Sequence, residues 1–437
     1  MASNAAASAS GRNTRPAERP ALAWAVLLGS GLLYGLTVWA TPIRSDEHDV
    51  LVAAMSLARD GALPFLSGSH DLGALLSVLA SSLLELGGDP PIAMVRLPSI
   101  LATAVAAAWL FVWLREHAGT TVAGISTILF VPSGWALQGA HSAGQGALLT
   151  LLVLVSATWL FDASRSSGGA TRRRIAAAAL LLIAFQLQPS AAIAALGLLI
   201  WCLPGMLRAL VDQHFARRTP ILIVAAAVFL PLLALIAPAV IGTVTASLLS
   251  ATAESEVSGD NLFYLRDLWV QAPLLTLFLP VAAVFAWRRS PPLAAHALVL
   301  LIVPLLVHSV MGSKAAGACA YVIPYLAIIY ALALAGPAKQ LRAHLSATLA
   351  RQGADRKFAQ VLSTALLLLL GAAAIVLANP AYRHTVQVVQ MSAGGITWAR
   401  QPAVTRVGAI WSDHAASGVF AGHPPLSLSV DPKEVAV

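Results

Sequence analysis

Apolar segments long enough to cross a lipid bilayer follow one another along most of this chain. The first runs from Ala21 to Thr41, about the length that a helix needs to span a hydrocarbon core of roughly 30 Å. Only 11% of the 437 residues are charged and 58% are hydrophobic. The sequence therefore predicts an all-α polytopic membrane protein. About eleven spans are expected, beginning near Ala21, Leu97, Thr120, Ala143, Ile175, Ala191, Pro220, Ala272, Pro292, Ala318 and Ala359.

The two ends of the chain differ in composition from the apolar part. Residues 1–20 are small, polar and basic, and we expect a disordered cytoplasmic tail there. The transmembrane domain is predicted over residues 21–378, followed by a small extracytoplasmic segment over residues 379–437. Cys202 and Cys319 both lie within apolar runs, which indicates neither a disulfide framework nor a thiolate metal site.

The distribution of basic residues predicts the orientation of the chain. The segment 72–86 is apolar, but it is short for a span and contains Glu85. If it does not cross, most of the 27 Lys and Arg residues fall on the cytoplasmic side, as the positive-inside rule requires. We therefore interpret 72–86 as a re-entrant or interfacial helix within one long extracytoplasmic loop, residues 42–96.

The short basic clusters between spans explain the net charge of +8 without nucleic-acid binding, which we do not expect. They are placed to meet membrane lipids instead. The Ala-rich composition fits a bacterial inner membrane with the N-terminus in the cytoplasm.

Two adjacent acids, Asp46 and Glu47, open the long loop directly after the first span. Residues 48–59 then repeat apolar side chains at helical spacing, which predicts a helix lying on the membrane surface. A carboxylate just outside the hydrocarbon can serve as a general acid or base for a lipid-linked substrate. The alternative is that both residues are ordinary solvated acids beside Arg44.

A phosphate leaving group on a lipid would need cationic partners on the same side of the membrane. Apart from the tail and the region of the first surface helix, the predicted exterior cations are Arg96, Arg266 and Lys314. We count all three as substrate-binding candidates, although each could instead extend to the membrane interface.

A short exterior loop is predicted over Trp135–Ser142, between the third and fourth spans. His141 and Gln145, in and just after it, are candidates to donate hydrogen bonds to a substrate, although a loop histidine is more often simply solvated. His296 and His308 share one span at a spacing better suited to packing or hydrogen bonding than to one metal ion.

No cofactor follows from the sequence, and a divalent cation is the one candidate. The acidic exterior loop that could meet such a cation contains Glu254, Glu256 and Asp260. Its Ser and Gly content indicates a solvated segment.

The first span, Asp46-Glu47, a surface helix, a Gly-rich turn, a short apolar helix and Arg96-Leu97-Pro98-Ser99 follow in this order. Over roughly residues 21–165 this resembles the GT-C membrane glycosyltransferases of the protein O-mannosyltransferase and aminoarabinose transferase type. The resemblance implies that Asp46 is the general base, deprotonating an acceptor hydroxyl as it attacks the anomeric carbon of a polyprenyl-phosphate sugar. It implies inverting sugar transfer on the extracytoplasmic face, to a glycan, lipid or protein acceptor, with Glu47 supporting Asp46.

The chain departs from the pattern of that family in two places. His70-Asp71 stands where relatives carry a Lys-Pro-Pro-type motif, and we count His70 among the substrate-binding candidates. Residues 140–146 contain no acid, whereas relatives present an Arg and an Asp there.

Two alternatives to an enzyme stay open. One is a noncatalytic GT-C-fold membrane scaffold, motivated by these two departures. The other is a transporter or flippase of a lipid-linked substrate, which would need ionisable residues or broken helices at mid-membrane. The predicted span centres hold almost no charge.

Overall fold

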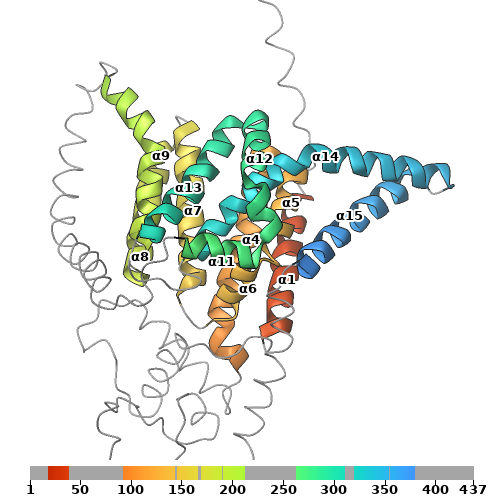
Figure 1. Ribbon diagram of the computed structural model, residues 1–437, viewed down its shortest axis with the longest axis horizontal. Coiled ribbons are helices and arrows are strands. Elements are labelled where there is room, and N and C mark those ends of the chain that lie inside the picture. Colours follow the sequence, from red (N-terminus) through yellow and green to blue (C-terminus); the bar gives the residue numbers. More distant parts are fainter. Residues whose placement is uncertain are drawn as a thin grey trace, which may run out of the picture.

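The structure is a computed structural model that describes residues 18–38, 92–142, 145–165, 169–188, 190–211, 262–310, 319–353 and 355–378. Within these ranges the chain is helical and contains no strand (Figure 1). The helices are α1 (Glu18–Thr37), α4 (Ile92–Ala118), α5 (Thr120–Phe130), α6 (Gly134–Ala140), α7 (Gly146–Arg165), α8 (Ala170–Leu187), α9 (Ala191–Val211), α11 (Phe263–Gln271), α12 (Pro273–Arg289), α13 (Pro291–Val310), η3 (Ala320–Val322), α14 (Ile323–Arg351) and α15 (Arg356–Ala378).

Helices occupy the apolar segments because a helix pairs its backbone N–H and C=O groups internally, as a bilayer without water requires. Among the described residues, five helices are long and apolar enough to cross a membrane, or up to seven spans if each of two bent pairs is one. On α1, Leu28, Leu32 and Leu36 follow one another at successive turns and are 66%, 64% and 72% exposed, as on a face turned to lipid. The chain is an integral membrane protein, as predicted.

Every predicted span except the one near Pro220 coincides with a described helix. The segment near Pro220 lies outside the described residues, as does 72–86. So do most of the predicted N-terminal tail, most of the predicted long loop and the C-terminal segment from residue 379 onward.

Two parallel helices, α4 and α7, lie in the main hydrophobic core. The indole Nε1 of Trp109 donates a hydrogen bond of 2.9 Å to Thr158 Oγ1, and that of Trp113 donates one of 3.2 Å to Asp162 Oδ1. In each pair the two residues are 49 positions apart in the sequence. The constant offset shows that the two helices run in the same direction, so their C-terminal ends lie at the same end of the bundle.

Helix α1 packs against α4 in the opposite direction. A Cβ added to Gly31 would lie 3.9 Å from the Cβ of Ala104, while Val38 at the end of α1 contacts Arg96 near the start of α4. The last turn of α1 therefore meets the first turns of α4.

The predicted loop over Trp135–Ser142 is wrong for most of its length, because Gly134–Ala140 forms helix α6. Helices α5 and α6 meet at an angle of 68°. The Ser133 hydroxyl begins α6 by accepting a hydrogen bond of 3.3 Å from the Ala136 N–H, as an N-cap does. Trp135 is 1% exposed, so the helix is stabilised by burial as well as by its cap.

Helix α14 leaves the bundle sideways, and α15 folds back from its far end (Figure 1). The first part of α14, up to Leu332, is almost continuously buried, whereas the residues after Gly336 are exposed or half-buried. Helix α12 ends beside the point of departure, because a Cβ added to Gly336 would lie 3.7 Å from Arg289 Nη1.

Candidate functional site

Arg96, in the first turns of α4, lies buried against the end of α1. Its Nη1 donates a hydrogen bond of 2.9 Å to the carbonyl oxygen of Val38, and the residue is 1% exposed. The end of a helix has carbonyl groups without intrahelical partners and a partial negative charge, both of which suit a guanidinium. Arg96 therefore holds α1 in place, rather than extending along the membrane interface to water.

His141, which ends α6, reaches the same turn of α1. Its Nε2 lies 3.1 Å from the Thr37 hydroxyl and 3.1 Å from the Tyr34 carbonyl oxygen. The Thr37 hydroxyl donates its own hydrogen to Leu33 O at 2.7 Å, so both groups facing Nε2 act as acceptors. Nε2 therefore carries a hydrogen. At 2% exposed, His141 is a buried contact and not the solvated loop residue that its position in the sequence favours.

Tyr34 links α1 to the break between α5 and α6. Its hydroxyl donates a hydrogen bond of 2.9 Å to the carbonyl oxygen of Val131, the residue that follows α5. A helix break leaves such carbonyls without an intrahelical partner, and in a membrane another group of the protein must supply one. Tyr34 is not among the residues predicted from the sequence, although a lone tyrosine near the end of an apolar span is a signal that could have pointed to it.

Of the other candidate residues predicted from the sequence, the structure describes two, Gln145 and Arg266. Gln145 is half-buried directly before α7, and its carbonyl accepts the N–H of Leu149. Arg266 lies exposed on α11. Asp46, Glu47, His70 and Lys314 lie outside the described residues.

A second polar cluster lies where α13 ends and η3 begins. His308 Nε2 is 3.0 Å from the hydroxyl of Tyr321, and the rings of His308 and Tyr264 are 5.4 Å apart. All three residues are at most 4% exposed. His308 thus hydrogen-bonds, as the sequence predicted, and it joins the two helices on either side of the segment that contains Lys314.

This cluster belongs to the same end of the bundle as His141. The turn η3 packs against both α6 and α7, and Tyr264 belongs to α11, which also carries Arg266. The described structure therefore brings Arg96 and His141 together at the end of α1 and places the helix bearing Arg266 on the same side.

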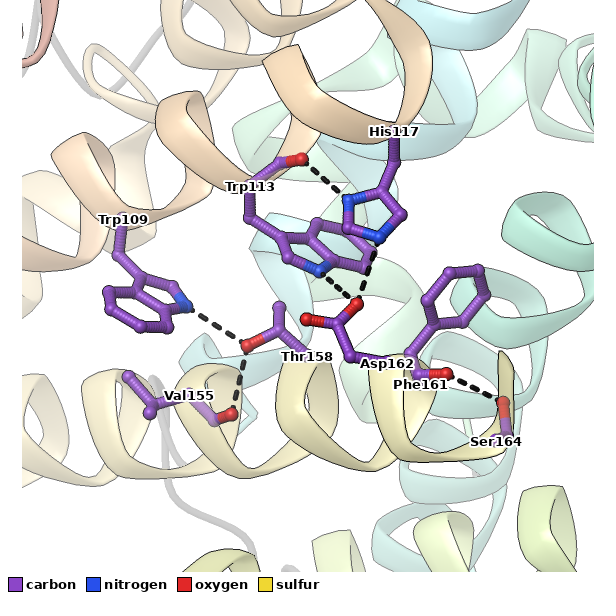
Figure 2. A network of polar contacts seen from close by, with 8 residues as sticks. All are labelled: Trp109, Trp113, His117, Val155, Thr158, Phe161, Asp162 and Ser164. Atoms are coloured by element: carbon purple, nitrogen blue, oxygen red, sulfur yellow. Dashed lines mark hydrogen bonds and ion pairs between the residues drawn. The ribbon is translucent and has the colours of Figure 1, made fainter. Parts of the chain in front are cut away.

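The opposite end of α4 holds a polar network of another kind (Figure 2). His117 Nε2 lies 2.9 Å from Asp162 Oδ1, and His117 Nδ1 lies 2.9 Å from the carbonyl oxygen of Trp113. A carboxylate and a carbonyl can only accept, so both ring nitrogens carry hydrogens and the histidine is the cation of an ion pair. With the Trp113 indole also donating to Asp162, this network fastens α4 to α7.

His296 lies next to that network without a hydrogen-bond partner among the described residues. It is 1% exposed and packs among aromatic rings, with centroid distances of 4.9 Å to Trp201 and 5.1 Å to Phe161. Of the two roles predicted for this histidine, packing is the one that the described contacts show. Within the described part of the chain, no three His, Cys, Asp or Glu side chains are grouped as a metal ion would need.

The comparisons with known proteins find a likeness in structure and none in sequence. No protein-family model and no curated protein matches the chain. The crystal structure of ArnT from Cupriavidus metallidurans bound to undecaprenyl phosphate matches with a TM-score of 0.52 at 16% identity, over 94% of this chain and 86% of that one. The structure of the same protein in the apo state matches with a TM-score of 0.55, also at 16% identity, over 93% and 85%.

ArnT is an aminoarabinose transferase of the GT-C family. At this level of identity the likeness concerns the fold, and it extends over nearly the whole chain rather than over residues 21–165 alone. The chain has the ArnT-like polytopic helical fold that the order of its first motifs predicted.

Proposed function

We propose that this chain is a membrane glycosyltransferase that moves a sugar from a polyprenyl-phosphate donor to an acceptor hydroxyl on the extracytoplasmic face. The observation that carries the proposal is the fastening of the end of α1. Arg96 and His141 are both buried. By hydrogen bonds of 2.9 to 3.1 Å they hold the backbone carbonyls of Val38 and Tyr34 and the side-chain hydroxyl of Thr37. Asp46 and Glu47 follow in the sequence shortly afterwards.

Such fastening matters because a general base works only when it is held within hydrogen-bond reach of the proton that it takes. Helix α1 also packs along α4, with Tyr34 fully buried. The polar contacts with Arg96 and His141 add to this packing by fixing the last turn of α1, from which the chain continues toward Asp46 and Glu47. In this proposal Arg96 and His141 are positioning residues.

In the reaction, the Asp46 carboxylate takes the proton of the acceptor hydroxyl. The hydroxyl oxygen forms a bond to the anomeric carbon as the bond from that carbon to the phosphate oxygen breaks. One displacement inverts the anomeric configuration, and the polyprenyl phosphate leaves with the bonding electron pair. Glu47 supports Asp46 through contacts to the acceptor.

The phosphate that leaves carries negative charge, which cations on the same side would stabilise. Arg266 and Lys314 are our candidates for this role. The hydrogen bond between His308 and Tyr321, and the contact of His308 with Tyr264, tie the chain on both sides of Lys314 to the helix that carries Arg266. The crystal structure of ArnT with undecaprenyl phosphate supports a donor of this lipid class.

The decisive experiment compares Asp46→Asn with the wild type, first by transfer from a polyprenyl-phosphate sugar to acceptors in membranes and then by mass spectrometry of envelope glycans in a complemented deletion strain. Asp46→Asn keeps the shape of the side chain but removes the base, so we expect transfer to be lost at unchanged expression and thermal midpoint. A deletion strain with glycans identical to those of the parent would refute the transferase function.

Two departures from the family pattern in the sequence support one alternative function. A noncatalytic membrane scaffold of the same fold would explain why His70 replaces the family lysine motif and why residues 140–146 contain no acid. Full biological activity in the double variant Asp46→Asn, Glu47→Gln would support the scaffold and exclude the enzyme.

A further inference from the structure

Helix α14 is too long to lie wholly within a bilayer. With η3 it forms a continuous candidate span of 32 residues, Ala320–Arg351, which at about 1.5 Å per residue is about 48 Å long. The hydrocarbon core is about 30 Å thick. Since the buried first part of α14 packs among the other helices, the part after Gly336 must reach the membrane surface. Figure 1 shows this part extending sideways past the bundle.

The projecting part of α14 is amphipathic. Leu341, Leu345 and Leu349 follow one another at intervals of one turn and therefore share one face. Leu341 is 50% exposed, and the other two are half-buried. Lys339 and Arg342 are exposed on other faces of the same turns. An apolar stripe beside cations is typical of helices that lie in the interface between headgroups and acyl chains.

Seven exposed cations gather around this projection, and we call them the basic ledge. They come from the end of α12, from the projecting part of α14 and from the start of α15, and Gly336 next to Arg289 joins the first group to the second. The basic ledge consists of Arg288, Arg289, Lys339, Arg342, Arg351, Arg356 and Lys357.

No acidic side chain in the described part of α14 and α15 offsets this charge except Asp355. That carboxylate is already engaged as the cap of α15, where its Oδ2 accepts the backbone N–H of Lys357 at 3.0 Å and of Phe358 at 3.4 Å. With seven cations of its own and this single acid on the described part of α14 and α15, the basic ledge keeps a large excess of positive charge, and anionic groups from outside would be attracted to it.

The basic ledge lies at the end of the bundle that the positive-inside rule predicts to be cytoplasmic. Arg289 ends α12 and is separated by Ser290 alone from α13, whose His296 packs against Phe161 near the C-terminal end of α7. The same end carries Arg115 and Arg165, on the last turns of α4 and α7.

We propose that the basic ledge binds the headgroups of anionic phospholipids, while the stripe of Leu341, Leu345 and Leu349 enters the adjoining acyl region. The partner is the bilayer and not an acidic protein, because the leucines lie on a helix that begins inside the membrane, and Leu341 is exposed beside the cations Lys339 and Arg342. This surface is separate from the site of sugar transfer, and the proposal does not depend on that activity.

The test compares thermal unfolding in nanodiscs of pure phosphatidylcholine and in nanodiscs that also contain phosphatidylglycerol. The ledge variant is Lys339→Gln, Arg342→Gln, Arg351→Gln. The matched control is Arg165→Gln, Arg172→Gln, Arg174→Gln, which removes the same number of exposed cations at the same end of the bundle. We expect phosphatidylglycerol to raise the midpoint for the wild type and the control, and to leave that of the ledge variant unchanged.

Three outcomes would overturn the proposal. They are a wild type indifferent to phosphatidylglycerol, a control variant that loses the response as fully as the ledge variant, and an equal response to inorganic phosphate added to phosphatidylcholine nanodiscs. Should the ledge variant fail to fold, crosslinking of the wild-type protein still tests the proposal. A photoactivatable phosphatidylglycerol should then crosslink mainly within residues 336–358, and crosslinks confined to the other basic clusters would count against the ledge.

Discussion

Arg96 and His117 stand near opposite ends of one helix, α4, and each fastens its end to a different neighbour. Arg96 binds the carbonyl oxygen of Val38 at the end of α1, and His117 binds the carboxylate of Asp162 on α7. The first contact adjoins the proposed catalytic sequence, whereas the second lies at the far end. Substitutions at the two ends should therefore have different consequences.

Replacing Arg96 with lysine should lower transfer activity strongly. Lysine keeps the charge but lacks the planar guanidinium that reaches the Val38 carbonyl. We expect turnover to fall by about 100-fold, because a small misplacement of a catalytic group can cost that much, and stability to fall by about 2 kcal/mol. Turnover of folded protein in nanodiscs measures the first and thermal unfolding the second. Arg165→Lys, at the other end of the bundle, is the control and should change neither.

Replacing Asp162 with alanine should destabilise the protein while the folded fraction keeps its activity. The substitution removes the acceptor of both His117 and Trp113, and we expect a cost of about 2 kcal/mol for the donors left without a partner. Thermal unfolding and turnover per folded molecule separate the two effects. Activity lost at an unchanged midpoint would show that this network takes part in the reaction.

Two tyrosine substitutions form a matched pair. Tyr34→Phe removes the hydrogen bond to the Val131 carbonyl at the break between α5 and α6, and we expect a loss of about 1 kcal/mol. Tyr325→Phe removes a buried hydroxyl that has no hydrogen-bond partner among the described residues, so it should be neutral or stabilising. Thermal midpoints of the two variants test the difference, and equal midpoints would contradict it.

Gly197 should be intolerant of a side chain. A Cβ there would lie 3.3 Å from Leu300 Cδ2 and within 3.8 Å of Pro304, so Gly197→Ala should push α9 away from α13 and cost about 1–3 kcal/mol. Gly29→Ala, on the exposed face of α1, meets nothing within 4 Å. It should be neutral or stabilise the helix by up to about 1 kcal/mol. The order of the two thermal midpoints is the measurement.

The helical segments could be predicted from the sequence because length and apolar composition decide whether a segment can satisfy its backbone within a bilayer. About eleven spans were predicted, and the described residues contain five candidate spans, or up to seven. The bend between α5 and α6 was missed, although Pro132 and Ser133 mark it. Both are ordinary signals for the end of one helix and the cap of the next. Such signals are missed when an apolar segment is judged only by its length.

The burial of Arg96 and His141 could not be predicted in the same way. Both depend on contacts with the last turn of α1, which lies 58 and 104 residues away in sequence. Sequence pattern alone identifies a cation or a histidine near a span end, but whether it meets water or another helix depends on packing. The roles of Asp46, Glu47, His70 and Lys314 stay predictions.

The contact between Val38 and Arg96 also means that the stretch from residue 39 to residue 95 starts and finishes at one point of the scaffold. Because the two attachment points of this segment lie together, we expect that it can be exchanged as a cassette without displacing α1 from α4. Chimeras that carry the corresponding segment of another protein of this fold should therefore still insert and assemble. The substrate preference of these chimeras would reveal how far the exchanged segment determines substrate specificity.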